Sequence, residues 1–311
     1  MITAVSLNPS IDRTLTVENF TAGGLNRVLE RSDVAAGKGI NVALAASALG
    51  LDAECIGFMY ADSAPIFERR LIVSSTPYDF ITCEGSARTN IKVLDRAAGV
   101  VTELNEAGRS VSEADLTAML DLVSRHAEDS DMLVLSGSTP PGCPPDFYRT
   151  LIHAVEGLGC RCALDADGER LRLGLEAAPY LIKPNRSELE AMEGCALRTL
   201  PELRKAALKL IEGGVSIVAV SLGAEGAMIT DGNETLFARK LNVDAKSTVG
   251  AGDSMVAGLC AGIIADDSLE DMFRIGVASA TARCITPGGK QVDKTVYKAC
   301  LDMVQIERVL V

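Results

Sequence analysis

Histidine, long basic runs and long apolar runs are scarce in this 311-residue sequence, and each scarcity argues against a class of function. The two histidines, His126 and His153, lie in helical patterns far from any glycine-rich turn, which argues against histidine-based catalysis. The formal net charge is −12 without a long Lys/Arg run, which argues against nucleic acid or an anionic membrane as the main partner. No apolar run is long enough to cross a bilayer.

Features of secretion and two common nucleotide-binding motifs are also missing. Residues 1–5 have no basic segment, so we expect no signal peptide. The nine cysteines are odd in number and scattered, which predicts reduced thiols in a cytoplasmic protein. No G-x-x-x-x-G-K-[ST] occurs, which excludes a P-loop enzyme, and no G-x-G-x-x-G follows the first predicted strand, Ile2–Leu7, which weakens a nicotinamide hypothesis.

Strands and helices alternate regularly from about residue 110 onward. This alternation indicates an α/β fold with a doubly wound, mostly parallel sheet that carries helices on both faces. In such folds ligands bind beyond the carboxyl ends of the strands. We expect one shared rim for the loops at the predicted strand ends, namely Asn8, Ser136, Lys183, Leu222 and Gly250.

Two other segments, at about 12–35 and 86–105, have short alternating patterns without a helical period. They predict a small β-sheet beside the main core, which would act as a lid. We expect residues 1–311 to form a single domain, because neither an internal repeat nor a linker interrupts them.

The stretch Ser247–Ser254 combines a turn with few side chains and an acidic residue. Its turn, Gly250–Gly252, would let ligand oxygens approach backbone N–H groups at the start of a helix. Asp253 would repel phosphate there, so accepting a proton from a substrate hydroxyl is a fitting role. An ordinary aspartate at a helix start is the alternative. A short strand, Leu241–Val243, is predicted to lead into the turn.

A second glycine turn, Gly37–Gly39, opens a helix with one cation, Lys38, and one amide, Asn41. A plain helix start is the alternative, although lysine between two glycines is unusual there. Asp12 follows a predicted strand end, where it could bind sugar hydroxyls or serve only as a turn residue.

The other polar candidates are two arginines and a helix start. Arg27 and Arg88 lie in the predicted lid, where their forked donors could hold a phosphate, although single arginines are commonly solvated. Lys183 precedes Asn185 and Glu188, which lie three residues apart at a helix start. This pair could hold waters of a hydrated Mg²⁺, or it could cap the helix, and the two roles are compatible.

Seven stretches together resemble a known family. AAGKGINVA (35–43) and STVGAGDSMVAG (247–258) resemble the two signatures of the ribokinase-like, PfkB sugar kinase family. Five further stretches resemble the 1-phosphofructokinase and tagatose-6-phosphate kinase branch of this family: NPSID (8–12), ARTNIKV (87–93), SGSTPPG (136–142), KPNRSE (183–188) and SLGAEG (221–226). The matches run in order from residue 4 to about 290.

This resemblance implies a role for each site residue. Asp253 would be the base that deprotonates the sugar hydroxyl, and the anion hole would consist of Gly250, Ala251 and Gly252. The sugar phosphate would be held by Asp12, Gly37, Lys38, Asn41 and Arg88, with Arg27 reaching in from a lid, its own or that of a neighbouring copy. Lys183, Asn185 and Glu188 would serve ATP and a water-held Mg²⁺. The nucleotide would be lined by Ser221, Leu222, Gly223, Ala224, Glu225 and Gly226. Lid sheets of the family often pair, which implies a homodimer.

The sequence departs from the family pattern in three places. Ala36 replaces the first of two usual glycines, the expected glycine-rich stretch Gly57–Ala61 is bulky, and the segment to about residue 80 is irregular. We expect these departures to affect the choice of sugar rather than the chemistry.

We therefore predict an ATP-dependent, Mg²⁺-requiring kinase for a ketohexose monophosphate. Fructose 1-phosphate is the first choice, tagatose 6-phosphate a close rival and fructose 6-phosphate a weaker one. An unphosphorylated sugar would leave Lys38, Arg88 and Arg27 without an anionic partner. A sugar-phosphate sensor without turnover is the alternative from another class, and an intact Asp253 argues against it.

Overall fold

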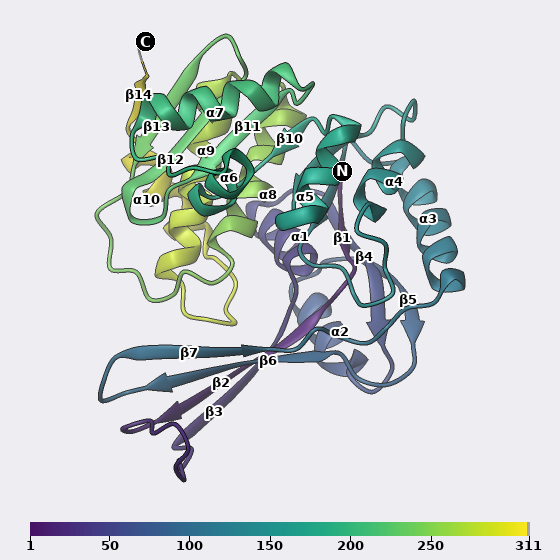
Figure 1. Cartoon of the computed structure of the whole chain (residues 1–311), viewed down its shortest axis with the longest axis vertical. Helices are drawn as coiled ribbons and strands as arrows, with labels where there is room; N and C mark the ends of the chain where they lie inside the picture. The colour runs from purple at the N-terminus through teal and green to yellow at the C-terminus, as the bar shows by residue number, and fades with distance from the viewer. Residues whose placement is uncertain (310–311) are drawn as a thin grey trace.

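The computed structural model describes residues 1–309 and contains two β-sheets (Figure 1). Residues 310 and 311 of the predicted domain lie outside the described residues. The larger sheet contains β1 (Ile2–Ser6), β4 (Ala53–Tyr60), β5 (Tyr78–Cys83), β8 (Met132–Ser136), β9 (Arg161–Asp165), β10 (Leu181–Ile182), β11 (Ile217–Ser221), β12 (Gly226–Thr230), β13 (Thr235–Arg239) and β14 (Ile306–Arg308). Their order is β14-β13-β12-β11-β10-β9-β8-β1-β4-β5.

The strand pairing of this sheet is mostly parallel. Every neighbouring pair from β5 through β4, β1, β8, β9 and β10 to β11 is parallel, whereas β12, β13 and β14 add to the β11 side as antiparallel strands. The chain passes from β1 to β4 and β5 on one side and then crosses to β8 on the other side. Such a reversal opens a crevice beyond the carboxyl ends of the two central strands. The predicted doubly wound fold is confirmed.

Helices cover both faces of this sheet. One face carries α1 (Lys38–Leu49), α2 (Ala64–Val73), α8 (Ala251–Ala265), α9 (Leu269–Ile285) and α10 (Lys294–Met303). The other face carries α3 (Glu113–Ala127), α4 (Phe147–Ala154), α5 (Gly168–Gly174), α6 (Arg186–Glu193) and α7 (Leu200–Glu212). Along β8, Met132 and Val134 pack into the first core while Leu133 and Leu135 pack into the second, as the two-residue period of a strand requires.

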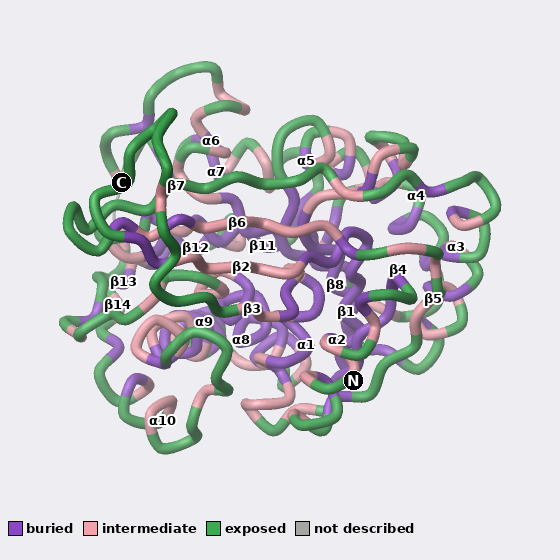
Figure 2. Tube along the Cα trace, turned by 90° about the horizontal axis from the view of Figure 1, so that it is seen from below, coloured by how far each residue is buried: buried purple, intermediate pink, exposed green. Residues whose placement is uncertain are grey.

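The second sheet is the predicted lid. It contains β2 (Ser10–Val17), β3 (Glu30–Ala36), β6 (Arg88–Asp95) and β7 (Val100–Asn105) in the order β3-β2-β6-β7. It projects from one side of the main body (Figure 1), and β7 is exposed along its whole length (Figure 2). Because β2 follows β1 almost directly, the root of the lid lies beside the carboxyl end of β1.

The predicted strand Leu241–Val243 is wrong. The described chain has no strand between β13 and α8, and the Gly250 turn therefore does not follow a strand end. Leu241 is buried and Val243 packs on the first core, so these apolar residues anchor a loop instead of pairing with a neighbour.

The bulky stretch Gly57–Ala61 lies mostly in a strand. Residues Gly57–Tyr60 belong to β4, and Phe58, Met59 and Tyr60 are buried in the two cores. The following segment, to about residue 80, contains helix α2 and the start of β5.

His126 and His153 lie in the last turns of α3 and α4, and all nine cysteines are free thiols. Among residues 1–309, no helix has both the length and the apolar character to cross a membrane.

Candidate active site

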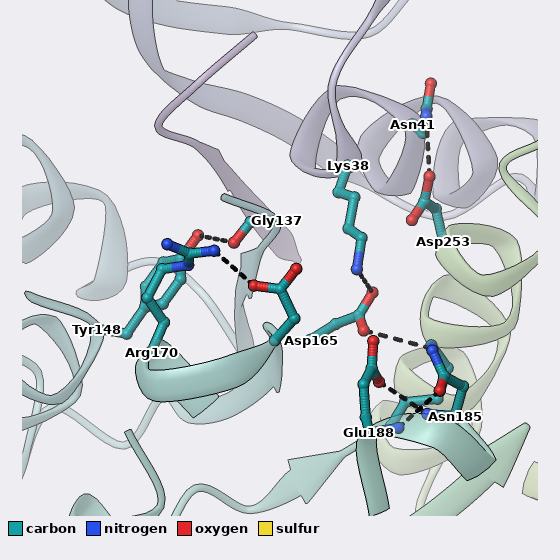
Figure 3. A network of polar contacts seen from close by, with 11 residues as sticks. Lys38, Asn41, Gly137, Tyr148, Asp165, Arg170, Asn185, Glu188 and Asp253 are labelled. Carbon is teal, nitrogen blue, oxygen red and sulfur yellow. Dashed lines mark hydrogen bonds and ion pairs between the residues drawn. The ribbon is translucent and has the colours of Figure 1, made fainter. Parts of the chain in front are cut away.

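The two glycine turns meet in space. Residues 37–41 open α1, residues 250–253 open α8, and these helices pack together. The side-chain Nδ2 of Asn41 donates a hydrogen bond of 2.8 Å to Oδ2 of Asp253 (Figure 3). A side chain at Gly39 would place its Cβ 2.3 Å from the carbonyl oxygen of Val5, so only glycine lets α1 begin this close to β1.

The turn before α8 has the geometry of an anion site. Gly250 has a φ of 79°, the left-handed region that glycine adopts freely. Of the predicted anion-hole residues, Ala251 donates its N–H to the carbonyl oxygen of Thr248 at 3.2 Å. Within residues 1–309, the N–H groups of Gly250, Gly252 and Asp253 donate to no other group. A Cβ on Gly252 would lie 3.3 Å from Nζ of Lys183, so the Lys183 ammonium lies close to the backbone of this turn. Helix N-terminal N–H groups of this kind bind phosphate oxygens.

Asp253 is a buried carboxylate with a shifted pKa. Asp253 as a whole residue is 6% exposed. Burial, together with the nearby charge of Asp165, raises its pKa to about 6, although Lys38, Asn41 and Lys183 oppose the rise. A carboxylate with this pKa is largely ionised at neutral pH and is a stronger base than an exposed aspartate.

Asp165, at the end of β9, lies between Lys38, which was predicted to hold the sugar phosphate, and Lys183, which was predicted to serve ATP. Its carboxylate is 2% exposed and lies 3.4 Å from Nζ of Lys38 and 3.3 Å from Nζ of Lys183. Burial alone would raise its pKa, but the two lysines outweigh burial and hold the pKa below the usual range. No sequence motif assigned Asp165 a role, and its position at the carboxyl end of a predicted strand was the available signal.

A cavity of about 250 Å³ lies between the main sheet and the root of the lid. It is lined by Ser6, Asn8, Lys38, Arg88, Asn90, Asn105, Ser136, Gly137, Ser138 and Asp167. Three of these polar side chains have a buried oxygen without a hydrogen-bond partner among the described residues: Oδ1 of Asn8, Oδ1 of Asn90 and Oγ of Ser136. Because buried polar atoms are normally satisfied, each of these oxygens calls for a donor from an ordered water or from a ligand.

Asp12 lies beside this cavity but is already paired. Its carboxylate accepts hydrogen bonds of 3.1 Å from Nδ2 of Asn90 and from Oγ of Ser10, and it forms a 3.1 Å ion pair with Lys92. Lys92 and Asn90 reach Asp12 because β2 and β6 pair in register. Both were missed in the sequence, because only strand pairing brings them together.

The two predicted lid arginines differ in position. Arg88 lines the cavity, with Nε donating to the carbonyl oxygen of Asn8 at 3.3 Å and Nη1 to that of Glu106 at 3.1 Å. Arg27 is exposed in the connection between β2 and β3 and is not among the cavity-lining residues.

The start of α6 has the predicted capping geometry. Asn185 Oδ1 accepts from the backbone N–H of Glu188 at 2.9 Å, and Glu188 Oε2 accepts from that of Asn185 at 2.8 Å. Glu188 Oε1 has no hydrogen bond within residues 1–309. No group of three or more acidic, cysteine or histidine side chains in this range could enclose a metal. One free carboxylate oxygen suits a hydrated Mg²⁺ held through water.

The predicted nucleotide loop follows β11 and includes a short 3₁₀ turn, Gly223–Glu225. A parallel bridge joins Ser221 to Asn185, so this loop begins beside the start of α6. Leu222 is buried, Gly223 and Ala224 are exposed, and Glu225 pairs with Arg186 at 2.7 Å. A Cβ on Gly226 would lie 2.0 Å from Ala238 O, so this glycine is needed for packing.

A larger hollow of about 710 Å³ lies elsewhere, between β5 and α3. Its lining includes Asp79, Asp121 and Arg125 but none of the predicted site residues. We place the candidate site at the smaller cavity, because Lys38, Arg88 and the three residues with unpartnered oxygens line it.

Known proteins resemble this chain in sequence and in fold. The model of the pfkB family carbohydrate kinases matches residues 3–294. The chain is 35% identical over 277 residues to a 1-phosphofructokinase of Vibrio cholerae, covering 89% of this chain and 87% of the relative. It is 39% identical over 259 residues to a 1-phosphofructokinase of Rhodobacter capsulatus, covering 83% and 82%. The structure of Escherichia coli phosphofructokinase-2 in complex with substrates and products aligns with a TM-score of 0.90 at 30% identity, covering 97% of this chain and 98% of that one.

Proposed function

This chain belongs to the pfkB family of carbohydrate kinases, which are ATP-dependent sugar phosphotransferases, and we propose that its substrate is a ketohexose monophosphate. Fructose 1-phosphate, converted to fructose 1,6-bisphosphate, is the first choice, because the two relatives described above are 1-phosphofructokinases. Tagatose 6-phosphate is the close rival within the same chemistry. The proposed setting is the cytoplasm.

The cavity at the root of the lid carries this proposal. Lys38 and Arg88 offer two cations to it, and the oxygens of Asn8, Asn90 and Ser136 lack partners. A ligand that is both anionic and rich in hydroxyl groups satisfies both sets at once. An unphosphorylated sugar would use the oxygens but would leave Arg88 without an anionic partner, whereas Lys38 already pairs with Asp165.

In the proposed reaction, one proton moves from the sugar to Asp253 and one phosphoryl group moves from ATP to the sugar. Asp253 accepts the proton of the sugar's C6 hydroxyl, and that oxygen attacks the γ-phosphorus of ATP while the bond between this phosphorus and the β,γ-bridging oxygen breaks. ADP leaves, and Asp253 then loses the proton to water. The free N–H groups of Gly252 and Asp253, together with Lys183, stabilise the charge on the transferring group.

Mg²⁺ is the proposed metal. Glu188 would hold it through water, beside Asn185, while Ser221–Gly226 would line the nucleotide. When bound, the metal would neutralise charge on the ATP phosphates.

The lid supports a further proposal, that residues 1–311 form one kinase domain that pairs through its lid as a homodimer. Large apolar side chains are exposed on it: Phe20, Leu25, Val28, Leu29, Val100, Val101 and Leu104. Exposed apolar groups of this kind mark association surfaces. Arg27, exposed in the same region, would then be placed to enter the cavity of the neighbouring copy.

The test is ATP consumption with Mg²⁺ and matched concentrations of fructose 1-phosphate, tagatose 6-phosphate and fructose 6-phosphate. We expect kcat/KM to be highest for fructose 1-phosphate. A higher value for either rival would replace the substrate but keep the chemistry. Binding of the sugar phosphate and ATP without turnover of any of the three would favour the sensor. Light scattering before and after Leu25→Asp and Leu104→Asp would test the dimer, which should dissociate.

A further inference from the structure

Arg70 of α2 lies next to Asn41, whose amide donates to the proposed base Asp253, although no sequence motif pointed to Arg70. Its Nη1 donates to the backbone carbonyl oxygen of Ala35, the penultimate residue of lid strand β3, and to Oδ1 of Asn41 at 3.4 Å. No carboxylate in residues 1–309 forms an ion pair with Arg70. The guanidinium therefore spans three elements, α2, the end of β3 and the first turn of α1.

The neighbours of Asn41 determine the orientation of its side-chain amide, that is, which side Oδ1 and Nδ2 each face. A guanidinium can only donate hydrogen bonds, so the group that faces Arg70 must be the amide oxygen. An ionised carboxylate can only accept them, so the group that faces Asp253 must be the NH₂. The hydrogen bonds follow this order, Arg70 to Asn41 Oδ1 and Asn41 Nδ2 to Asp253. With a pure donor on one side and a pure acceptor on the other, the reversed amide is unfavourable on both sides.

We infer that Arg70 is a positioning residue for the proposed base: it holds the Asn41 amide with Nδ2 directed at Asp253 and ties that amide to the root of the lid. Its contribution to turnover rests on the proposed function, whereas its effect on the Asp253 carboxylate does not. The attachment to Ala35 fixes the guanidinium independently of the longer contact with Asn41.

The electrostatic surroundings agree with this role. Burial and the nearby Arg283 lower the pKa of Arg70 to about 10, partly offset by Asp12 and Asp253, so Arg70 is charged at neutral pH. Asp253 is faced by Lys38 and Asn41 from α1, Asp165 from β9 and Lys183 beyond β10. Replacing Arg70 by an apolar residue removes a positive charge and frees the amide, and both changes raise the pKa of Asp253.

The experiment compares Arg70→Met with Arg69→Met, because Arg69 is the adjacent residue on α2 and is exposed. NMR titration of the Asp253 side-chain carboxyl in the free protein should give a pKa about 0.5 or more higher in Arg70→Met than in wild type. Arg69→Met should match wild type. In turnover, we expect Arg70→Met to lower kcat by about tenfold or more, with KM for ATP within about twofold. Arg70→Lys should restore part of both properties, since one ammonium can reach one of the two acceptors.

Two results would overturn the inference. Equal Asp253 pKa values in Arg70→Met and Arg69→Met would show that Arg70 does not act on the base. A raised KM for the sugar phosphate with an unchanged kcat would make Arg70 a substrate ligand instead. If Arg70→Met does not fold, the same titration on Arg70→Lys and Arg70→Gln decides the question. Absence of wild-type turnover of fructose 1-phosphate would refute only the proposed substrate, because the NMR titration needs no substrate.

Discussion

Asn41 and Asp253 are 212 residues apart in sequence, yet the amide of one donates a 2.8 Å hydrogen bond to the carboxylate of the other. This bond joins the first turns of α1 and α8 and so connects the proposed sugar-binding turn to the proposed anion site. It also favours the ionised form of a carboxylate that burial disfavours. The balance between these two effects sets the pH range in which Asp253 can accept a proton.

We expect activity to rise as the pH increases through about 6. The pKa of Asp253 is raised to about 6, mainly by burial, and the group accepts a proton only when it is ionised. Plots of kcat/KM against pH should therefore have an acid limb near that value, measured at saturating Mg²⁺ and in buffers of constant ionic strength. A flat profile from about pH 5 to 8 would contradict the assignment of Asp253 as the base.

Asp253→Asn should lower kcat and raise the thermal stability of the protein at alkaline pH. The loss of the proton acceptor should lower kcat by about 10²–10⁴-fold, while ATP binding persists. The folded-state pKa of about 6 lies above the ordinary 3.8, so the stability that this group contributes below pH 3.8 is lost as the pH rises through about 6. Asparagine avoids that loss, so Tm at pH 8 should rise by about 5 °C.

The control is Asp302→Asn, which changes an exposed residue of α10 and should alter neither property. Near-normal turnover by Asp253→Asn would remove Asp253 from the chemistry. A lower Tm would show that the ionised carboxylate stabilises the fold.

Local sequence patterns predicted the parts of this site that depend on local chemistry. The glycine turns, the capping box of Asn185 and Glu188, and the lid segments follow from short-range preferences of the backbone. The sequence could not reveal that Asp165 separates two lysines, or that Lys92 pairs with Asp12, because these contacts depend on strand order. The false strand at Leu241–Val243 has a related cause, since burial of an apolar residue does not require strand pairing.

Asp165→Asn should shift the acid limb of the pH profile in the direction opposite to Arg70→Met. The negative charge of Asp165 contributes to the raised pKa of Asp253, so its removal should move the limb to lower pH.

The same substitution should also lower stability. Lys38 and Lys183 would lose their shared carboxylate, and a broken buried ion pair typically costs about 3 kcal/mol or more of unfolding free energy. Urea unfolding would measure this loss. The control is Asp146→Asn, which breaks the more exposed ion pair between Asp146 and Arg149.

Because the pKa of Asp165 is held below its usual range, its stabilising contribution is present above its unfolded pKa and is lost as the pH falls through the folded value. The stability difference between wild type and Asp165→Asn should therefore shrink in acid. A difference that grows in acid would mean that Asp165 is not paired as the ionised form.

Arg88→Ala should raise KM for the sugar phosphate by about 10–100-fold and leave KM for ATP within about twofold. Arg88 lines the cavity and uses Nε and Nη1 on the carbonyl oxygens of Asn8 and Glu106, which leaves Nη2 for an anion. The matched control is Arg96→Ala in the same lid sheet, where the arginine side chain forms an exposed ion pair with Glu30. Initial rates over a matrix of both substrates separate the two KM values. Equal increases for the two substrates would place Arg88 in the closure of the lid rather than in the sugar-phosphate site, since a lid serves both ligands whereas a direct phosphate contact serves one.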